Sequence, residues 1–176
     1  STTLMLLGFQ RSQADHTLFV RNVNGKYIAV LVYVDDIIIA SNDDAEVVEL
    51  KADLERAFKL RDLGTLKYFL GLEIARNASG ISVCQRKYAL GLLEETGLLA
   101  CKPSNIPMEP SIKLISDGDE PPMEDPASYR RLVGKMMYLT ITRPDITYAV
   151  NRLCQFTSAP KESHMKAAHK VLHYVK

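Results

Sequence analysis

The chain contains no tryptophan and only three cysteines, Cys84, Cys101 and Cys154, in 176 residues. The cysteines form no C-x-x-C pair and are odd in number, which predicts reduced thiols rather than a disulfide or zinc framework. No apolar run reaches the length of a membrane span, and the N-terminus lacks the basic segment and cleavage site of a secretory signal. We therefore expect an intracellular protein without a membrane partner.

The chain also has little net charge, but its charges are unevenly distributed. The formal value is +1, yet residues 129–176 carry nine Lys or Arg against two acids. Residues 109–125 carry six acids against one lysine. A basic C-terminal third favours a polyanionic partner, although a solvated helical surface explains the same charge equally well.

One acidic pair interrupts the longest apolar run, which extends from Tyr27 to Ala40. The tetrad Tyr33-Val34-Asp35-Asp36 lies in its middle, and ionised carboxylates are costly to remove from water unless they are paired or bind a cation. A solvated turn and a divalent metal ion both account for the pair. The turn alone is less favoured because Asp-Asp lacks the glycine that tight hairpin turns prefer. A hard cation such as Mg²⁺ suits a site with few carboxylates.

A two-metal site needs a third carboxylate, and two candidates are present. Asp15 reads more readily as a turn acid, and Glu73 as a solvent-facing strand residue. We expect the missing ligand outside this chain.

Hydrophobic periodicity and turn residues predict an α+β fold, with a mixed or antiparallel sheet and packed helices followed by a helical region. Gly71 falls within the fourth predicted strand, where glycine marks a bulge, a close approach of a ligand or simple packing. The expected strands are residues 17–20, 26–34, 37–40, 66–75 and 81–84, and the expected helices are residues 44–58, 85–96, 126–140, 146–156 and 158–176.

Three further patterns have simpler explanations than catalysis. Asp43 and Asp44 are expected to be capping or first-turn acids of a helix rather than metal ligands. His169 and His173 have the spacing of a zinc pair, but no third ligand is evident. Arg143-Pro144-Asp145 predicts a helix-breaking turn with an Arg–Asp contact.

Several blocks in order resemble the reverse transcriptases of copia-type LTR retrotransposons, and the resemblance covers essentially the whole chain. They are DHTLF at 15–19, LVYVDDI at 31–37, DLGTLKYFLGLEI at 62–74, SVCQRKY at 82–88, YRRLVG at 129–134 and LTITRPDI at 139–146.

The resemblance implies roles for individual residues. Asp35 and Asp36 would be two of three metal-binding aspartates of the polymerase palm, with Tyr33 and Val34 beside the nucleotide and the primer end. Mg²⁺ or Mn²⁺, as two ions in the complete enzyme, would be the cofactor. Residues contacting the primer would be Phe69, Leu70, Gly71 and Leu72, and residues contacting the nucleic-acid backbone would be Arg130, Arg131, Lys135 and Arg143.

The same resemblance implies a division into three parts. Residues 1–100 would be the second part of the palm, and residues 101–125 a proline- and acid-rich linker. Residues 126–176 would be a basic thumb or connection region. The partners would be an RNA or DNA template-primer, deoxynucleoside triphosphates and the remainder of a Pol polyprotein, with fingers and palm upstream and ribonuclease H downstream. Family members work in cytoplasmic particles and deliver DNA to the nucleus.

One departure from the family limits the expected activity. The family's first catalytic aspartate lies in an upstream strand block with no equivalent here, so we expect no polymerase activity from this chain alone. The alternative is a degenerate transposon-derived remnant that at most binds nucleic acid.

Overall fold

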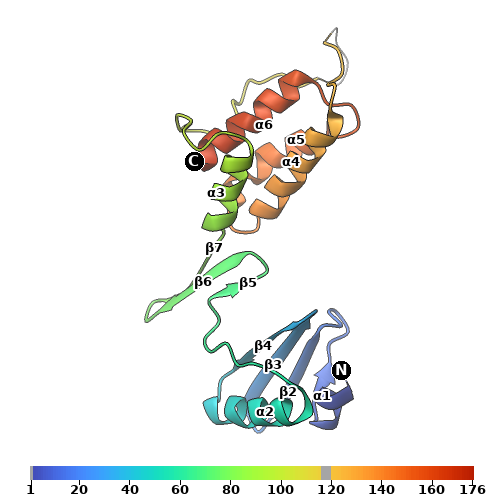
Figure 1. Cartoon of the computed structure of the whole chain (residues 1–176), viewed down its shortest axis with the longest axis vertical. Coiled ribbons are helices and arrows are strands. Elements are labelled where there is room, and N and C mark those ends of the chain that lie inside the picture. The colour runs from blue at the N-terminus through green and yellow to red at the C-terminus, as the bar shows by residue number, and fades with distance from the viewer. Residues whose placement is uncertain (1, 116–119) are drawn as a thin grey trace. The chain divides into compact units, whose positions relative to one another are not determined.

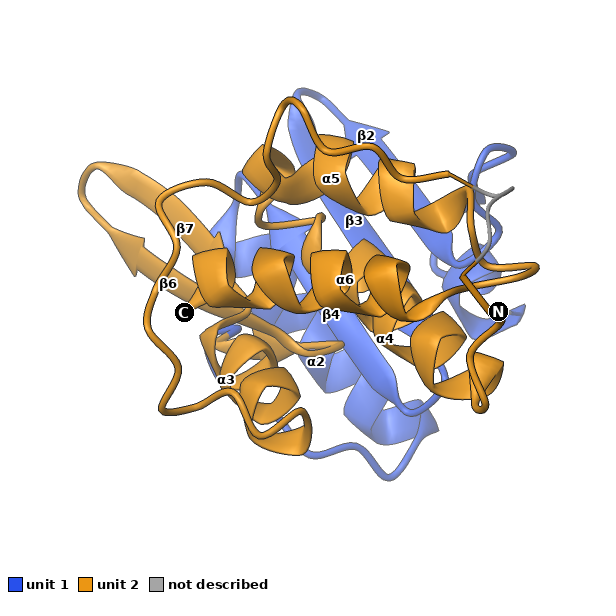
Figure 2. Cartoon of the chain, turned by 90° about the horizontal axis from the view of Figure 1, so that it is seen from above, with its two compact units in different colours: residues 1–66 blue, residues 67–176 orange. Residues whose placement is uncertain are grey.

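The computed structural model of the chain describes residues 2–115 and 120–176, and it divides into two compact units, residues 1–66 and 67–176 (Figures 1 and 2). Both units combine antiparallel strands with helices, which confirms the predicted α+β class. None of the described helices is long and apolar enough to cross a membrane.

Unit 1, residues 1–66, is a four-stranded antiparallel sheet with two helices. The sheet order is β1-β2-β3-β4. Its elements are α1 (Thr2–Leu6), β1 (Gln10–Arg11), β2 (Leu18–Val23), β3 (Lys26–Tyr33), β4 (Asp36–Ser41) and α2 (Asp44–Ala57). Alternation along β3 directs Ile28 and Val30 into a core that they share with Leu50 and Leu54 of α2. One face of the sheet is thereby packed against α2.

Two local predictions for unit 1 are confirmed. Asn24 and Gly25 form the β2–β3 turn with φ of 53° and 80°, the conformation that an Asn-Gly hairpin turn adopts. The Asp43 carboxylate accepts hydrogen bonds from the backbone N–H groups of Ala45 and Glu46, at 2.9 and 3.2 Å. Asp43 is therefore the N-cap of α2.

Unit 2, residues 67–176, joins a small sheet to a helical body. The antiparallel sheet has the order β5-β6-β7. Its elements are β5 (Tyr68–Phe69), β6 (Leu72–Asn77), β7 (Gly80–Cys84), α3 (Arg86–Glu95), α4 (Pro126–Leu139), the 3₁₀ helix η1 (Pro144–Ile146), α5 (Thr147–Cys154) and α6 (Glu162–Val175). The Asp125 carboxylate caps α4, and Pro126 is its first residue, as the sequence predicts.

The prediction of one continuous strand over residues 66–75 is wrong. The chain reverses at Leu70 and Gly71, so that β5 and β6 form a hairpin of their own. The turn was missed because leucine disfavours the left-handed backbone that such a turn requires, and an apolar run therefore gave no turn signal.

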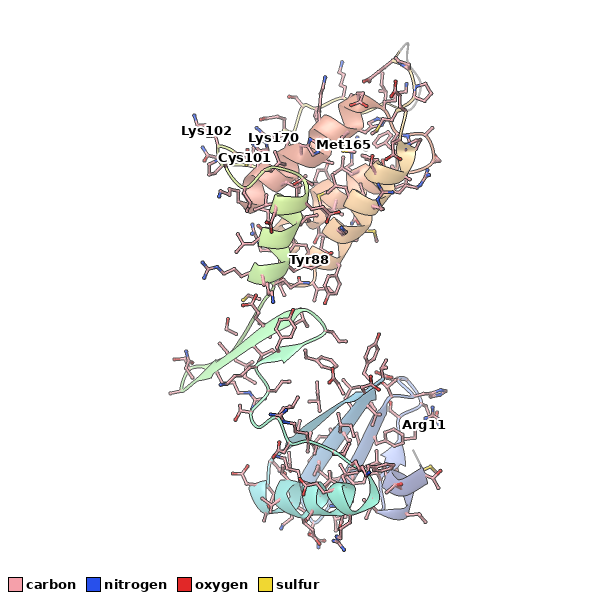
Figure 3. All side chains as sticks on the ribbon, viewed as in Figure 1. Arg11, Tyr88, Cys101, Lys102, Met165 and Lys170 are labelled. Carbon is pink, nitrogen blue, oxygen red and sulfur yellow. The ribbon has the colours of Figure 1, made fainter. Side chains whose placement is uncertain are left out.

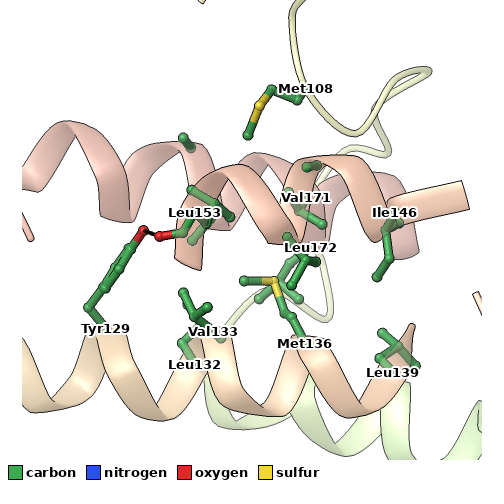
Figure 4. Packing of buried hydrophobic residues seen from close by; sticks show 14 of the residues in the cluster. Met108, Tyr129, Leu132, Val133, Met136, Leu139, Ile146, Leu153, Val171 and Leu172 are labelled. Carbon is green, nitrogen blue, oxygen red and sulfur yellow. Dashed lines mark hydrogen bonds between the residues drawn. The ribbon is translucent and has the colours of Figure 1, made fainter. Parts of the chain in front are cut away.

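The core of unit 2 lies between α4, α5 and α6. Its fully buried members include Met136, Leu139, Leu153 and Leu172 (Figure 4). Tyr129 is also buried, and its hydroxyl donates a 2.8 Å hydrogen bond to the Leu153 carbonyl. Burial raises the pKa of Tyr129 well above its usual value. The hydroxyl is thus a permanent donor that ties α4 to α5.

His164 is the one buried histidine among the described residues, and it packs at the start of α6. Its Nδ1 accepts a 3.0 Å hydrogen bond from the Lys161 backbone N–H, and its ring stacks on Phe156 with centroids 4.0 Å apart. Burial lowers the pKa of His164 below 6.5, against weaker opposing effects of the Ile115 carbonyl and the Glu120 carboxylate. The folded state therefore favours the neutral imidazole.

This burial predicts a loss of stability at mildly acidic pH. Because the folded pKa lies below the unfolded one, the contribution of His164 is fully present above about pH 6.5 and is lost as the pH falls toward the folded pKa. Urea unfolding between about pH 7.5 and about pH 5.5 should give a decreasing free energy of unfolding, and the pH slope should be smaller in His164→Gln. Equal slopes in the two proteins would contradict the account.

Candidate metal-binding and nucleic-acid-binding site

The acidic tetrad forms the tip of the β3–β4 hairpin. Tyr33 pairs with Asp36 across the two strands, so Val34 and Asp35 are the two central residues of the turn. The chain therefore reverses one residue earlier than expected, and Asp36 is the first residue of β4. Both aspartates are exposed.

The turn holds Val34 in an unfavourable backbone conformation. Its φ is +52°, a value that β-branched residues rarely adopt, and its side chain is 82% exposed. No packing in the unit therefore requires a valine here. A residue held in this region costs roughly 1–3 kcal/mol, and such residues cluster at functional sites.

Strand alternation places Asp36 on a defined face of the sheet. Tyr33 and Asp36 are cross-strand partners and share a face with Leu31 and Ile38. The intervening Val32 packs against the core under α2, on the opposite face. The Tyr33 ring and the Asp36 carboxylate therefore lie side by side, on the sheet face turned away from α2.

The two carboxylates have no partner within the described part of the chain. Neither Asp35 nor Asp36 forms a hydrogen bond or an ion pair there, whereas Asp43 and Asp62 of the same unit are bound to Lys26 and Lys51. Adjacent, exposed carboxylates with free oxygens suit a hard divalent cation, which takes few carboxylates and completes its shell with water and phosphate. The residues present thus fit Mg²⁺ or Mn²⁺.

Both candidates for a third carboxylate already accept hydrogen bonds from neighbouring groups. The Asp15 carboxylate accepts hydrogen bonds from the Thr17 N–H and hydroxyl at 2.9 and 2.6 Å, which lower its pKa and make it the expected turn acid. The Glu73 carboxylate accepts a 2.7 Å bond from the Lys87 N–H at the start of α3. Within residues 2–115 and 120–176, no three His, Cys, Asp or Glu side chains form a metal cluster.

The second candidate site is the β5–β6 turn. Phe69 pairs with Leu72, so Leu70 and Gly71 are its central residues, with φ of +48° and +81°. The Tyr138 hydroxyl of α4 donates a hydrogen bond to the Leu70 carbonyl. Sequence reasoning missed Tyr138, and no local pattern could have found it, because the two residues are 68 positions apart.

The four basic residues expected at a nucleic-acid backbone already have contacts within unit 2. Lys135 forms an ion pair with Glu95, the Arg131 guanidinium is 3.6 Å from the Asp125 carboxylate, and Arg130 donates to the Thr157 carbonyl at 3.3 Å. Their role toward nucleic acid stays a prediction.

The expected Arg143–Asp145 contact is confirmed. The Arg143 Nη2 atom is 2.7 Å from the Asp145 carboxylate, and the guanidinium lies 5.5 Å from the centroid of the Tyr174 ring. The bond raises the pKa of Arg143 and lowers that of Asp145. The pair closes the turn between α4 and α5.

The strain at Val34 predicts a stabilising substitution. Asparagine tolerates the left-handed region, so Val34→Asn should raise the free energy of unfolding of unit 1 by about 1 kcal/mol in urea titration. Val34→Thr is the matched control, because it is polar but β-branched and should give no gain. An equal gain in both variants would attribute the effect to polarity and contradict the strain.

Comparison with known proteins identifies the chain's relatives. A family model described as reverse transcriptase (RNA-dependent DNA polymerase) matches residues 1–110. The chain is 42% identical over 173 residues, 98% of its length, to the Retrovirus-related Pol polyprotein from transposon RE1 of Arabidopsis thaliana. It is 41% identical over 99% of its length to the corresponding polyprotein from transposon RE2 of the same plant. It is also 31% identical over 90% of its length to the polyprotein from transposon TNT 1-94 of Nicotiana tabacum.

The chain spans 12% of the length of each of these polyproteins. No solved structure matches it significantly. The ordered blocks, the acidic hairpin, the family model and the near-complete coverage by Pol relatives agree. The chain belongs to the reverse transcriptase (RNA-dependent DNA polymerase) family, of the copia retrotransposon type.

Proposed function

We propose that the β3–β4 hairpin is the metal-binding hairpin of a reverse transcriptase palm, in which Asp35 and Asp36 hold Mg²⁺ or Mn²⁺. The reaction is the addition of deoxynucleotides to a primer 3′ end on an RNA or DNA template. The observation that carries the proposal is the pair of exposed carboxylates at the tip of an apolar hairpin, which have no partner among the described residues. Family membership supports the reaction class.

The proposed role of each residue at the tip follows from its place in the hairpin. Asp35 at the apex and Asp36 at the start of β4 would hold the ions, two in the complete enzyme. When bound, two such ions activate the attacking oxygen and stabilise the leaving one in phosphoryl transfer. Tyr33 lies on the same sheet face as Asp36 and would pack against the primer end.

The sheet edge suggests where the third carboxylate joins. β4 is the last strand in the order β1-β2-β3-β4, so one of its edges has no strand partner among the described residues. Residues 37–39 of this edge strand are all isoleucines and all half-buried, although edge strands are normally blunted by charge. We propose that an aspartate-bearing strand from the upstream part of a polyprotein pairs here. The chain alone would then lack polymerase activity.

The remaining regions are assigned on the same basis. Residues 1–100 would be palm with the Phe69–Leu72 turn as primer grip, residues 101–125 a linker, and residues 126–176 the thumb or connection. Arg130, Arg131, Lys135 and Arg143 would contact phosphates, since lysine and arginine supply most of the sequence-independent affinity for nucleic acid. Their acid partners would be exchanged for phosphates on binding. The other partners would be deoxynucleoside triphosphates and the upstream and downstream parts of a Pol polyprotein.

A second candidate function is a transposon-derived remnant that only binds nucleic acid. The favouring observation is that only two carboxylates group in the described chain, where the complete reaction needs three. The remnant would bind template-primer without any metal dependence at Asp35 and Asp36.

Metal titration tests the carboxylate pair in the chain as it stands. Isothermal titration with Mn²⁺ should show binding that Asp35→Asn or Asp36→Asn weakens by about tenfold or more, because each substitution removes a charged ligand. Asp44→Asn removes an exposed carboxylate of the same unit that has no side-chain partner within residues 2–115 and 120–176, and it should leave the affinity unchanged. Equal affinities in all three variants would contradict the metal site.

Primer extension tests the reaction in a longer protein. A Pol polypeptide that carries this chain with its upstream region should extend a primer on poly(rA), and the 176-residue chain should not. Asp36→Asn in the longer protein should lower kcat by roughly 10³-fold, because a lost metal removes several kcal/mol of transition-state stabilisation. Retained extension in that variant would overturn the assignment of Asp36 as a metal ligand. Extension by the 176-residue chain would contradict the proposed inactivity of the chain alone.

A further inference from the structure

The β5–β6 turn contains a leucine in a backbone conformation that leucine does not favour. Leu70 has φ of +48° and a side chain that is 44% exposed. Asparagine or glycine would fill this first central position without strain. A non-glycine residue persists in this region only where its surroundings determine the conformation.

The surroundings of this turn are supplied by one side chain of α4. The Tyr138 hydroxyl donates to the Leu70 carbonyl, which satisfies the backbone oxygen at the apex of the turn. A Cβ atom built on Gly71 would lie 3.2 Å from the same hydroxyl and 3.6 Å from Cε1 of the ring. Tyr138 therefore fixes one turn residue by hydrogen bonding and lies so near the next that a Cβ atom there would be in tighter than ordinary contact.

Tyr138 is itself held in place by α3. The Tyr88 ring, labelled in Figure 3, packs edge-on against the Tyr138 ring, with centroids 5.0 Å apart and planes at 80°. The Tyr88 hydroxyl donates to the Lys135 carbonyl of α4 at 3.2 Å. Edge-to-face aromatic pairs are a preferred arrangement. The two tyrosines thus connect α3, α4 and the turn through contacts internal to unit 2.

We propose that Tyr138 is a positioning residue that sets the backbone of the Leu70–Gly71 turn for contact with the primer and couples this turn to α4. The proposal rests on the proposed primer-grip function of the turn. α4 also carries Arg130 and Arg131, so the hydroxyl joins the primer-contacting backbone to the helix expected at the phosphates. In this proposed role Tyr138 acts through the turn and not on the primer itself.

A double-mutant cycle on the 176-residue chain tests the contact. Gly71→Ala should destabilise unit 2 strongly in the parent, because it adds a close contact to a left-handed residue, and less in Tyr138→Phe, where the oxygen is gone. We expect the unfolding constants to be non-additive by about 2- to 10-fold, the coupling typical of residues in contact. Gly97→Ala is the matched control, since Gly97 has φ of +70° and no atom within 4 Å of its would-be Cβ. The effects of Gly97→Ala and Tyr138→Phe on the free energy of unfolding should be additive. Additive effects of Gly71→Ala and Tyr138→Phe would overturn the contact.

A crosslinking measurement tests the positioning role. If the Tyr138 contact served stability alone, its removal would not change the crosslinking yield to the primer. Photoreactive benzoylphenylalanine at Tyr68, an exposed strand position beside the turn, should crosslink to the primer of a bound template-primer. Tyr138→Phe should lower the yield several-fold, 4-aminophenylalanine at 138 should restore it by restoring a donor, and Tyr148→Phe on α5 should change nothing. Equal yields with and without the hydroxyl would overturn the positioning role. If the parent chain bound template-primer but never crosslinked to it, the primer-grip assignment of the turn would fail. The positioning role of Tyr138 would fail with it, whatever the result of the double-mutant cycle.

Discussion

Two-residue hairpin turns are the constraint on which both candidate sites depend. Closing β3 onto β4 with only Val34 and Asp35 fixes the register that pairs Tyr33 with Asp36. That register sends the Tyr33 ring and the Asp36 carboxylate to one face of the sheet, and a slip of one residue would send them to opposite faces. The same constraint at Leu70 and Gly71 exposes a backbone apex in unit 2. In both turns a bulky apolar residue takes a backbone conformation that asparagine or glycine would adopt without strain.

Each turn is supported differently by its own unit. The β3–β4 tip extends from a sheet whose packing against α2 anchors Val32, and its carboxylates have no partner in the part of the chain that the structure describes. Charge that no side chain neutralises is available to a cation, which is the reason for assigning metal binding there. The β5–β6 tip has no such freedom, because Tyr138 bonds its carbonyl and occupies the space beside Gly71. One tip is therefore open for an ion, and the other is held rigid by a helix.

Sequence patterns predicted the parts of the fold that local chemistry decides. The Asn24-Gly25 turn, the Asp43 cap and the Asp125-Pro126 helix start were correct because each depends on residues a few positions apart. The Leu70–Gly71 turn was missed because leucine within an apolar run is typical of a strand and not of a turn. The Tyr138 contact and the Lys135–Glu95 ion pair, 68 and 40 positions apart in sequence, are decided by tertiary packing, which no local pattern records. The acidic tetrad was found because paired carboxylates in an apolar run are unusual, while its register came only from the strand pairing.

Paramagnetic broadening by Mn²⁺ tests the central claim most directly. In a heteronuclear NMR spectrum of the isotope-labelled chain, substoichiometric Mn²⁺ should broaden first the backbone amides of residues 33–37, because the ion would be held at Asp35 and Asp36. Added Mg²⁺ should reverse the effect by competition for the same oxygens. Broadening centred on other acids, such as Asp43 to Glu46 or Glu94 and Glu95, with the hairpin tip unaffected, would contradict the assignment of the metal site.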